Sequence, residues 1–139
     1  MKPMASKIII FDTSVFIDHL RANKFGDCLE NLHGLIRNSS VVLSELLRGT
    51  TKKEEKEFVS YIAGNYPIFT PTEKNWIESG EILSSINNDK GFSPAKLRDL
   101  HFDVLIALTA RSNGATVITS NTVDFELIRS YKDFNLEIW

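Results

Sequence analysis

Short apolar runs alternate with segments of helical spacing along the chain. The β-branched run Lys7–Phe11 predicts a fully buried strand, because short continuous apolar runs are typical of such strands. Four further short runs predict strands at 40–43, 67–69, 115–119 and 136–138. Amphipathic or capped segments predict helices at 15–20, 27–36, 44–49, 52–63, 72–86, 100–111 and 123–129, with a loop over 87–94. This alternation indicates an α/β fold, in which helices flank both faces of a central, mostly parallel β-sheet.

The helix expected at 100–111 differs from the others in being apolar on almost every side. A helix with this pattern is buried rather than superficial, and Gly114 ends it. In parallel α/β sheets, ligands bind outside the carboxyl ends of the strands. A functional site is therefore expected among the residues that directly follow the strands.

The composition is that of an ordinary globular protein. The 139 residues, of which 42% are hydrophobic and 24% charged, suit one domain over residues 1–139 and exclude intrinsic disorder. The apolar runs are far shorter than the roughly 18 residues that a membrane-spanning helix needs. Residues 1–7 are too short and polar for a signal peptide. We therefore expect no membrane association.

The cysteine count and the net charge bear on the cellular compartment and on the class of nucleic-acid-binding protein. The single cysteine, Cys28, excludes an internal disulfide and a CxxC zinc motif, so we expect a cytoplasmic protein. The net charge of −2 argues against a non-specific nucleic-acid coat, which is usually basic. It does not exclude a nuclease, because a nuclease that holds divalent metals needs several carboxylates, and these lower the net charge.

Three carboxylates follow predicted strands, and a fourth lies in the apolar helix. Asp12, Glu45 and Asp124 follow the first, second and fourth strands, and Asp103 lies near the start of the helix at 100–111. An ionised carboxylate in apolar surroundings is very costly unless it is paired or metal-bound. Each acid also has an ordinary structural interpretation: Asp12 and Asp103 as helix caps, Glu45 and Asp124 as turn or first-turn acids.

Several carboxylates in a small volume repel one another unless hard cations neutralise them. Mg²⁺ and Mn²⁺ prefer such oxygen ligands, and two ions about 4 Å apart can activate a water and stabilise the leaving oxygen of a phosphodiester. The three histidines, His19, His33 and His101, are scattered and suggest no zinc site. The four acids therefore favour metal-dependent hydrolysis of phosphodiester bonds.

Four segments resemble, in order, the sequence motifs of PIN-domain ribonucleases. These segments are 11–18 (FDTSVFID), 44–49 (SELLRG), 103–110 (DVLIALTA) and 119–125 (TSNTVDF). The resemblance runs from Lys7 to Trp139, which is almost the whole chain. The length and the lack of extra domains look most like the VapC-type toxins of bacterial and archaeal toxin–antitoxin pairs.

This resemblance implies a PIN-like fold and an endoribonuclease that depends on Mg²⁺ or Mn²⁺. Such an enzyme leaves a 5′-phosphate and a 3′-hydroxyl, often forms a homodimer, and is held inactive by a small cognate antitoxin. The family's acidic positions, which bind metal and serve catalysis, fall on Asp12, Glu45, Asp103 and Asp124. Its supporting polar positions fall on Thr13 or Ser14, Thr119 and Asn121.

Asp99 lies one helical turn before Asp103, so both side chains can face the same site. We assign the third acid to Asp103, because the apolar stretch of the motif follows it directly, and we assign Asp99 to the surface or to a supporting position. Arg48, Lys52 and the segment 96–98 are candidates for short contacts with RNA phosphates. Because the chain has no long basic stripe, we expect selective cutting in an exposed loop of a structured RNA such as a tRNA or an rRNA.

Three other functions are weighed against this one. An aspartate-dependent phosphatase of the haloacid dehalogenase type would have an acid two residues after Asp12, where the chain has Ser14. A phosphoacceptor receiver domain needs an acidic pair before that aspartate, and the preceding segment has no acid. A PIN-like protein that binds RNA or a partner without catalysis would be free to lose the four acids, all of which are present. A metal titration discriminates between these functions.

Overall fold

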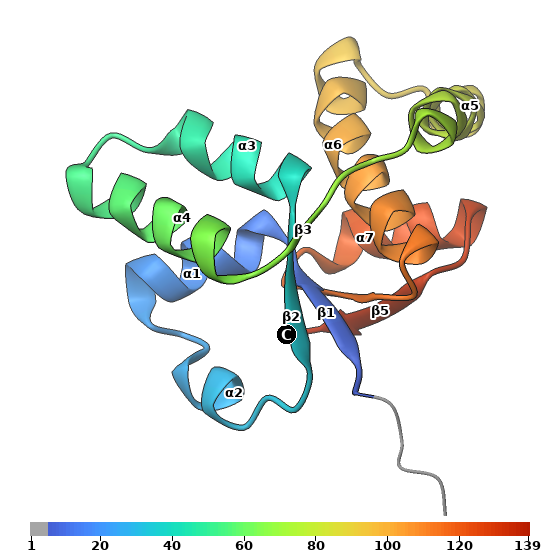
Figure 1. The fold of residues 1–139 in the computed structure, drawn as a ribbon. Helices are drawn as coiled ribbons and strands as arrows, with labels where there is room; N and C mark the ends of the chain where they lie inside the picture. Colours follow the sequence, from blue (N-terminus) through green and yellow to red (C-terminus); the bar gives the residue numbers. More distant parts are fainter. Residues whose placement is uncertain (1–5) are drawn as a thin grey trace, which may run out of the picture.

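The computed structural model describes residues 6–139 and contains a five-stranded sheet flanked by helices (Figure 1). The strands are β1 (Ile8–Phe11), β2 (Leu35–Ser39), β3 (Ile68–Phe69), β4 (Thr116–Thr119) and β5 (Asn135–Ile138). The helices are α1 (Thr13–Ala22), α2 (Gly26–Glu30), α3 (Ser40–Gly49), α4 (Lys53–Asn65), α5 (Glu73–Lys90), α6 (Pro94–Ser112) and α7 (Thr122–Tyr131). The predicted α/β class is confirmed, and every strand pair is parallel.

The strand order β3-β2-β1-β4-β5 places β1 at the centre of the sheet. From β1 the chain moves outward through β2 and β3, and it then crosses to the other side of β1 to form β4 and β5. Ile9 pairs with Ile36 on β2 and with Thr116 on β4. Because all strands are parallel, their carboxyl ends meet at one edge. The chain order reverses between β1 and β4, so the carboxyl ends of these two strands form the topological switch point, beside which such sheets bind ligands.

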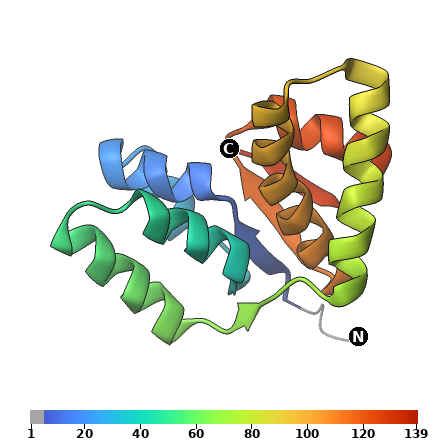
Figure 2. The same cartoon turned by 90° about the horizontal axis from the view of Figure 1, so that it is seen from above.

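Successive residues of β1 point to opposite faces of the sheet and enter two separate cores. Ile10 joins the larger core, to which α3, α4, α5, α6 and α7 contribute apolar side chains. Ile9 and Phe11 join a smaller core with Val15 of α1 and Phe25. Figure 2 shows α3 beside α4, and α5 beside α6. Both faces of β1 are therefore covered, as its continuous apolar sequence predicts.

The second strand was predicted at 40–43, but it lies at Leu35–Ser39. The predicted helix over 27–36 is correspondingly wrong beyond Glu30, where α2 ends. The Ser39 hydroxyl accepts hydrogen bonds from the backbone N–H groups of Val41 and Val42, and this cap starts α3 at Ser40. The apolar run after Ser39 is buried as a helix face, and a short run of this kind looks the same in a strand and in a buried helix. Glu45 consequently lies in the second turn of α3 instead of directly after a strand.

Helix α6 begins six residues earlier than its apolar pattern predicts. Ser93 caps it by accepting a hydrogen bond from the Lys96 N–H, and Pro94 occupies the first turn, where its fixed φ suits a helix start. The predicted loop over 87–94 is therefore wrong over most of its length, because α5 also extends to Lys90. The expected burial of this helix is confirmed, since Leu100 is completely inaccessible to solvent.

Within residues 6–139, none of the helices is both long enough and apolar enough to cross a bilayer. The expectation that the chain starts without a signal peptide rests mainly on residues 1–5, which lie outside the described residues. The assignment of residues 1–139 to one domain stays a prediction.

Candidate active site

Asp12 lies directly after β1, at the topological switch point of the sheet. Its backbone N–H donates to the Ile118 carbonyl at 2.9 Å, which connects it to β4. Its side chain is buried, and Oδ2 accepts hydrogen bonds from Ser14 Oγ at 2.8 Å and from Thr119 Oγ1 at 2.9 Å. Burial raises the pKa of this carboxyl, and the two hydroxyl donors oppose the rise because they stabilise the charged form.

Asp12 occupies the N-cap position of α1, and its side chain is hydrogen-bonded to two hydroxyls. Within residues 6–139, the side chain makes no capping hydrogen bond to the first turn of α1. Its hydroxyl donors are Ser14, which lies in that first turn, and Thr119, which lies on β4. Because a helix cap needs no partner on a neighbouring strand, the ordinary interpretation as a cap does not account for the hydrogen bond with Thr119.

Two helices bring further carboxylates to Asp12. Glu45 of α3 accepts a hydrogen bond from Thr13 Oγ1 at 3.0 Å through Oε1. Asp103 lies in the middle of α6, half-buried, so it does not cap a helix that begins at Val104. One carboxylate oxygen from each of Asp12, Glu45 and Asp103 lies within 4.8 Å of the other two. We call these three residues the acidic triad.

Burial and mutual repulsion disfavour the charged forms of the triad. Burial, together with the charges of Asp12, Glu45 and Asp124, raises the pKa of Asp103 to about 9. Burial also raises the pKa of Glu45, and the charge of Asp12 adds to that rise. A cation among these oxygens would offset the repulsion, and Mg²⁺ and Mn²⁺ take carboxylate oxygens by preference. The donor set and its electrostatics therefore fit a hard divalent cation.

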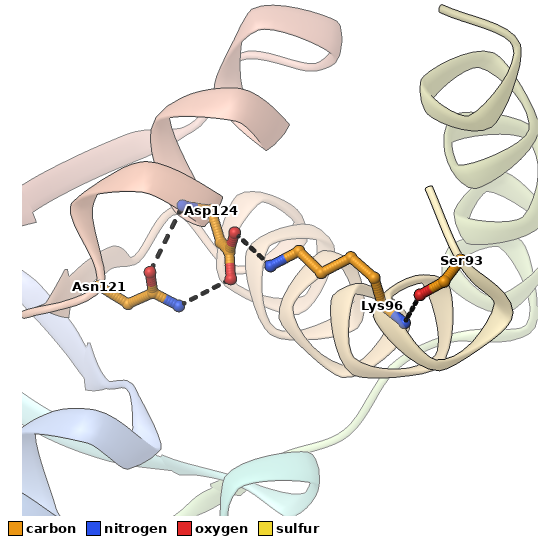
Figure 3. A network of polar contacts seen from close by, with 4 residues as sticks. All are labelled: Ser93, Lys96, Asn121 and Asp124. Atoms are coloured by element: carbon orange, nitrogen blue, oxygen red, sulfur yellow. Dashed lines mark hydrogen bonds and ion pairs between the residues drawn. The ribbon is translucent and has the colours of Figure 1, made fainter. Parts of the chain in front are cut away.

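Asp124 lies beside the triad, with protein donors on both of its carboxylate oxygens (Figure 3). Asn121 caps α7 through its side chain, which accepts from the Asp124 N–H, and its Nδ2 donates to Asp124 Oδ2 at 3.1 Å. Lys96 Nζ donates to Asp124 Oδ1 at 2.7 Å. Asp124 is thus a first-turn acid of α7, as its ordinary interpretation predicts. It stands outside the acidic triad, although its charge raises the pKa of Asp103.

The predicted supporting side chains form a hydroxyl network between the ends of β1 and β4. Thr119 is completely buried, and its Oγ1 donates to Asp12 and accepts from the Asn121 N–H at 2.9 Å. Ser14 Oγ donates to Asp12 and accepts from the Ser120 N–H at 3.2 Å. These bonds hold the Asp12 carboxylate in one orientation and connect it to the cap of α7.

Arg48 and Asp99 lie at the edge of the triad. The Arg48 guanidinium stands over the Phe102 ring, 5.3 Å from its centroid, and its charge lowers the pKa of Glu45. Asp99 is exposed and lies outside the triad, while its charge raises the pKa of Glu45. The structure therefore brings Asp103 into the triad and leaves Asp99 at the surface.

The ion pair between Lys96 and Asp124 is the feature that sequence reasoning missed. The segment 96–98 was identified only as a candidate phosphate contact. Lys96 precedes Asp103 by seven residues, and residues seven apart share one face of a helix. This signal becomes visible only if the helix is predicted from Pro94 onward.

A model of the PIN domain family matches residues 9–130, a range that contains all four acids. The chain belongs to the PIN domain family. The PIN-like fold expected from the four motifs is therefore confirmed. Among curated proteins, no significant match to this PIN domain is found.

Several solved structures share the fold of this PIN domain. VapBC2 from Rickettsia felis, bound to a DNA fragment from its promoter, matches with a TM-score of 0.68 at 24% identity, over 95% of this chain and 98% of that chain. DNA-bound VapBC from Salmonella typhimurium matches with a TM-score of 0.66 at 21% identity, over 98% and 99%. VapBC-1 from nontypeable Haemophilus influenzae matches with a TM-score of 0.70 at 19% identity, over 95% and 98%. At these identities the likeness establishes the fold.

Proposed function

We propose that this PIN-domain protein is an endoribonuclease that depends on Mg²⁺ or Mn²⁺ and acts as the toxin of a VapBC-type toxin–antitoxin pair. The acidic triad is the observation that carries the proposal. One oxygen from each of its three carboxylates lies within 4.8 Å of the others, at the carboxyl edge of the sheet. Membership of the PIN family supports nuclease chemistry, and the Vap complexes of the same fold support the toxin role.

The chain's own residues have separate tasks in this proposal. A bound divalent ion supplies an activated water and stabilises negative charge on the leaving oxygen of the phosphodiester. Asp12, Glu45 and Asp103 hold the ion. Ser14 and Thr119 orient Asp12 through its Oδ2 atom, because a carboxylate that is hydrogen-bonded on one oxygen keeps the other in a defined direction.

The remaining predicted residues surround the triad. Thr13 orients Glu45, and Asn121 orients Asp124, the fourth acid of the catalytic set. Arg48 carries its charge on the exposed side of α3, where we assign it to a backbone phosphate of the RNA. Cleavage leaves a 5′-phosphate and a 3′-hydroxyl.

Two protein partners belong to the proposal. A further structure of the same fold is a toxin–antitoxin complex from Klebsiella pneumoniae, and it supports a small cognate antitoxin for this chain. We also infer a homodimer. Trp76 and Ile77 are neighbours on α5 and are 52% and 61% exposed, and we assign these two apolar residues to the interface between the two copies.

The structure gives less support to the two alternative functions than to the nuclease. A phosphatase of the dehalogenase type needs a second acid at position 14, and the residue there is a serine that donates a hydrogen bond to Asp12. A binding protein without catalysis has no use for three carboxylates that repel one another. The triad therefore favours the nuclease.

The experiment is cleavage of total cellular RNA by the purified protein, with new 5′ ends mapped by sequencing. We expect cuts at one or a few loop sites of a stable RNA in Mn²⁺ or Mg²⁺, and no cuts in EDTA. The Asp103→Asn variant, purified in the same way, controls for contaminating nucleases. Undiminished cleavage in EDTA would contradict the proposed chemistry. Uniform degradation of all RNAs at low enzyme concentration would contradict the selectivity alone.

A further inference from the structure

The fourth acid of the site is neutralised from within the chain. Lys96 Nζ lies 2.7 Å from Asp124 Oδ1, the length of a strong charge-assisted hydrogen bond (Figure 3). The Asp124 side chain is 16% exposed, whereas that of Lys96 is 36% exposed. The Asp124 side chain is thus mostly covered, whereas about a third of the Lys96 side chain remains accessible to solvent.

The backbone of α6 places Lys96 where its charge reaches both acidic groups. Its N–H donates to the capping Ser93 Oγ at 3.2 Å, so it belongs to the ordered first turn of α6. Asp103 follows two helical turns later, a rise of about 10 Å on the same helix face. The Lys96 charge acts on Asp103 and lowers the pKa of that carboxyl, against the larger effects that raise it.

The hydrogen bonds of Asp124 separate it from the triad. Lys96 binds one carboxylate oxygen and Asn121 binds the other. The triad, in contrast, brings together three carboxylates within reach of one ion. Residues 6–139 therefore offer one set of convergent oxygen ligands and, next to it, a carboxylate that already has a cation.

We propose that the Lys96 ammonium supplies the second positive charge of this active site, in the place that a second metal ion would otherwise take beside Asp124. This inference rests on the proposed nuclease function. An ammonium has three N–H donors, and the bond to Asp124 uses one of them. The other two have no hydrogen-bond partner among residues 6–139, so they can contact an oxygen of the RNA phosphate. Lys96 is then a catalytic residue, positioned by Asp124 and Asn121.

Metal stoichiometry is the first test, because it needs no cleavage. Isothermal titration of the metal-free protein with Mn²⁺ is expected to give one ion for the wild type. In Lys96→Met, Asp124 loses its internal cation, and we expect a second ion, which the double variant Lys96→Met, Asp124→Asn loses again. Two ions in the wild type, or one ion in Lys96→Met, would overturn the proposal.

Lys132 provides a matched control for Lys96. Its Nζ lies 3.1 Å from Glu78 Oε1, and its side chain is 36% exposed, the same fraction as that of Lys96. It follows the C-terminal end of α7, eight residues after Asp124 and so about 12 Å along the helix from it. Lys132→Met removes an equivalent ion pair, so it should leave both the Mn²⁺ stoichiometry and the cleavage rate unchanged.

Cleavage kinetics are the second test. At a Mn²⁺ concentration that saturates only the first site, Lys96→Met is expected to lower kcat about 100-fold, the usual effect of losing one donor to developing charge. Higher Mn²⁺ should restore part of the rate, because a second ion then occupies the vacated position. Lys96→Arg, which keeps the charge, should retain one ion and most of the activity. Wild-type kcat in Lys96→Met would overturn the proposal.

The two proposals fail in distinguishable ways. If the wild type binds Mn²⁺ but cleaves no RNA, the nuclease function is wrong, and the stoichiometry of Lys96→Met still decides whether Lys96 replaces an ion. If the wild type and Lys96→Met cleave equally, the nuclease function stands and only the role of Lys96 is wrong. Circular dichroism of each variant shows whether it is folded before either comparison.

Discussion

The substitution Asp103→Asn is expected to stabilise the metal-free protein at neutral pH, although it removes a residue of the candidate active site. In the folded chain, burial and the neighbouring carboxylates raise the pKa of Asp103 from the ordinary 3.8 to about 9. At pH 7 the folded state therefore binds a proton that the unfolded chain releases. Below pH 3.8 the Asp103 carboxyl is protonated in both states, and its titration does not lower the free energy of unfolding. As the pH rises from 3.8 toward 9, the unfolded state releases the proton more readily, and the free energy of unfolding falls. Asparagine resembles the neutral acid and does not titrate.

The magnitude follows from the interval between the ordinary pKa and the working pH. Each pH unit corresponds to about 1.4 kcal/mol, so the roughly three units up to pH 7 give an upper limit of about 4 kcal/mol. Because Asp103 keeps some access to solvent, we take half of this, about 2 kcal/mol. At about 4 °C per kcal/mol for a domain of this size, the variant should melt about 8 °C above the wild type. At pH 5 the same reasoning gives a difference of about 3 °C.

Thermal unfolding in EDTA, followed by circular dichroism at several values between pH 5 and pH 8, measures this difference. Asp99→Asn is the matched control: it removes an exposed acid one turn earlier on α6 and should change Tm little at any pH. Saturating Mn²⁺ should reverse the order, because a ligand at 100 times its Kd stabilises the wild type by about 2.7 kcal/mol. The reasoning is refuted if Asp103→Asn melts below the wild type in EDTA at pH 7, or if the difference does not grow with pH.

Two further predictions concern Asp12 and the assembly of the chain. Asp12→Asn should abolish Mn²⁺-dependent cleavage while leaving the metal-free Tm unchanged or higher, since it removes a carboxyl whose charged form is disfavoured by burial. A Tm several degrees lower would contradict this. Light scattering at micromolar concentration should give a dimeric mass for the wild type. The double variant Trp76→Ser, Ile77→Ser should give a monomeric mass, because these exposed residues on α5 are assigned to the interface. A monomeric wild type would contradict the homodimer.

The sequence alone was sufficient to predict the fold class and to place Asp12 at the carboxyl end of the first strand. A run such as Ile8–Phe11 suits a strand that is covered on both faces, and the polar residues that follow it must lie at the end of the sheet. Local patterns carry this information because each side chain's face is set by its own strand or helix period. The same argument located β4 and Thr119, one end of the hydroxyl network around Asp12.

The positions of β2 and of the start of α6 depended on more than local pattern. The run that follows Ser39 is equally compatible with a strand and with a buried helix, and the cap at Ser39 together with the surrounding core selects the helix. The apolar periodicity did not predict the start of α6, because the first turn, at Pro94 to Lys96, is not part of the apolar pattern. Its capping residues were the only local signal.

Only the tertiary structure decided which charges meet. The four acids were recognisable along the chain, but the sequence contains no measure of the distance between helices that pack on the same sheet edge. The packing of α3 on β2, of α6 on β4 and of α3 against α6 brings Glu45 and Asp103 to Asp12. Asp124 on α7 instead meets Lys96, a partner 28 residues away. A one-dimensional pattern assigns each side chain to a face of its own element, and the separation between two such faces is set by the side chains that fill the core between them.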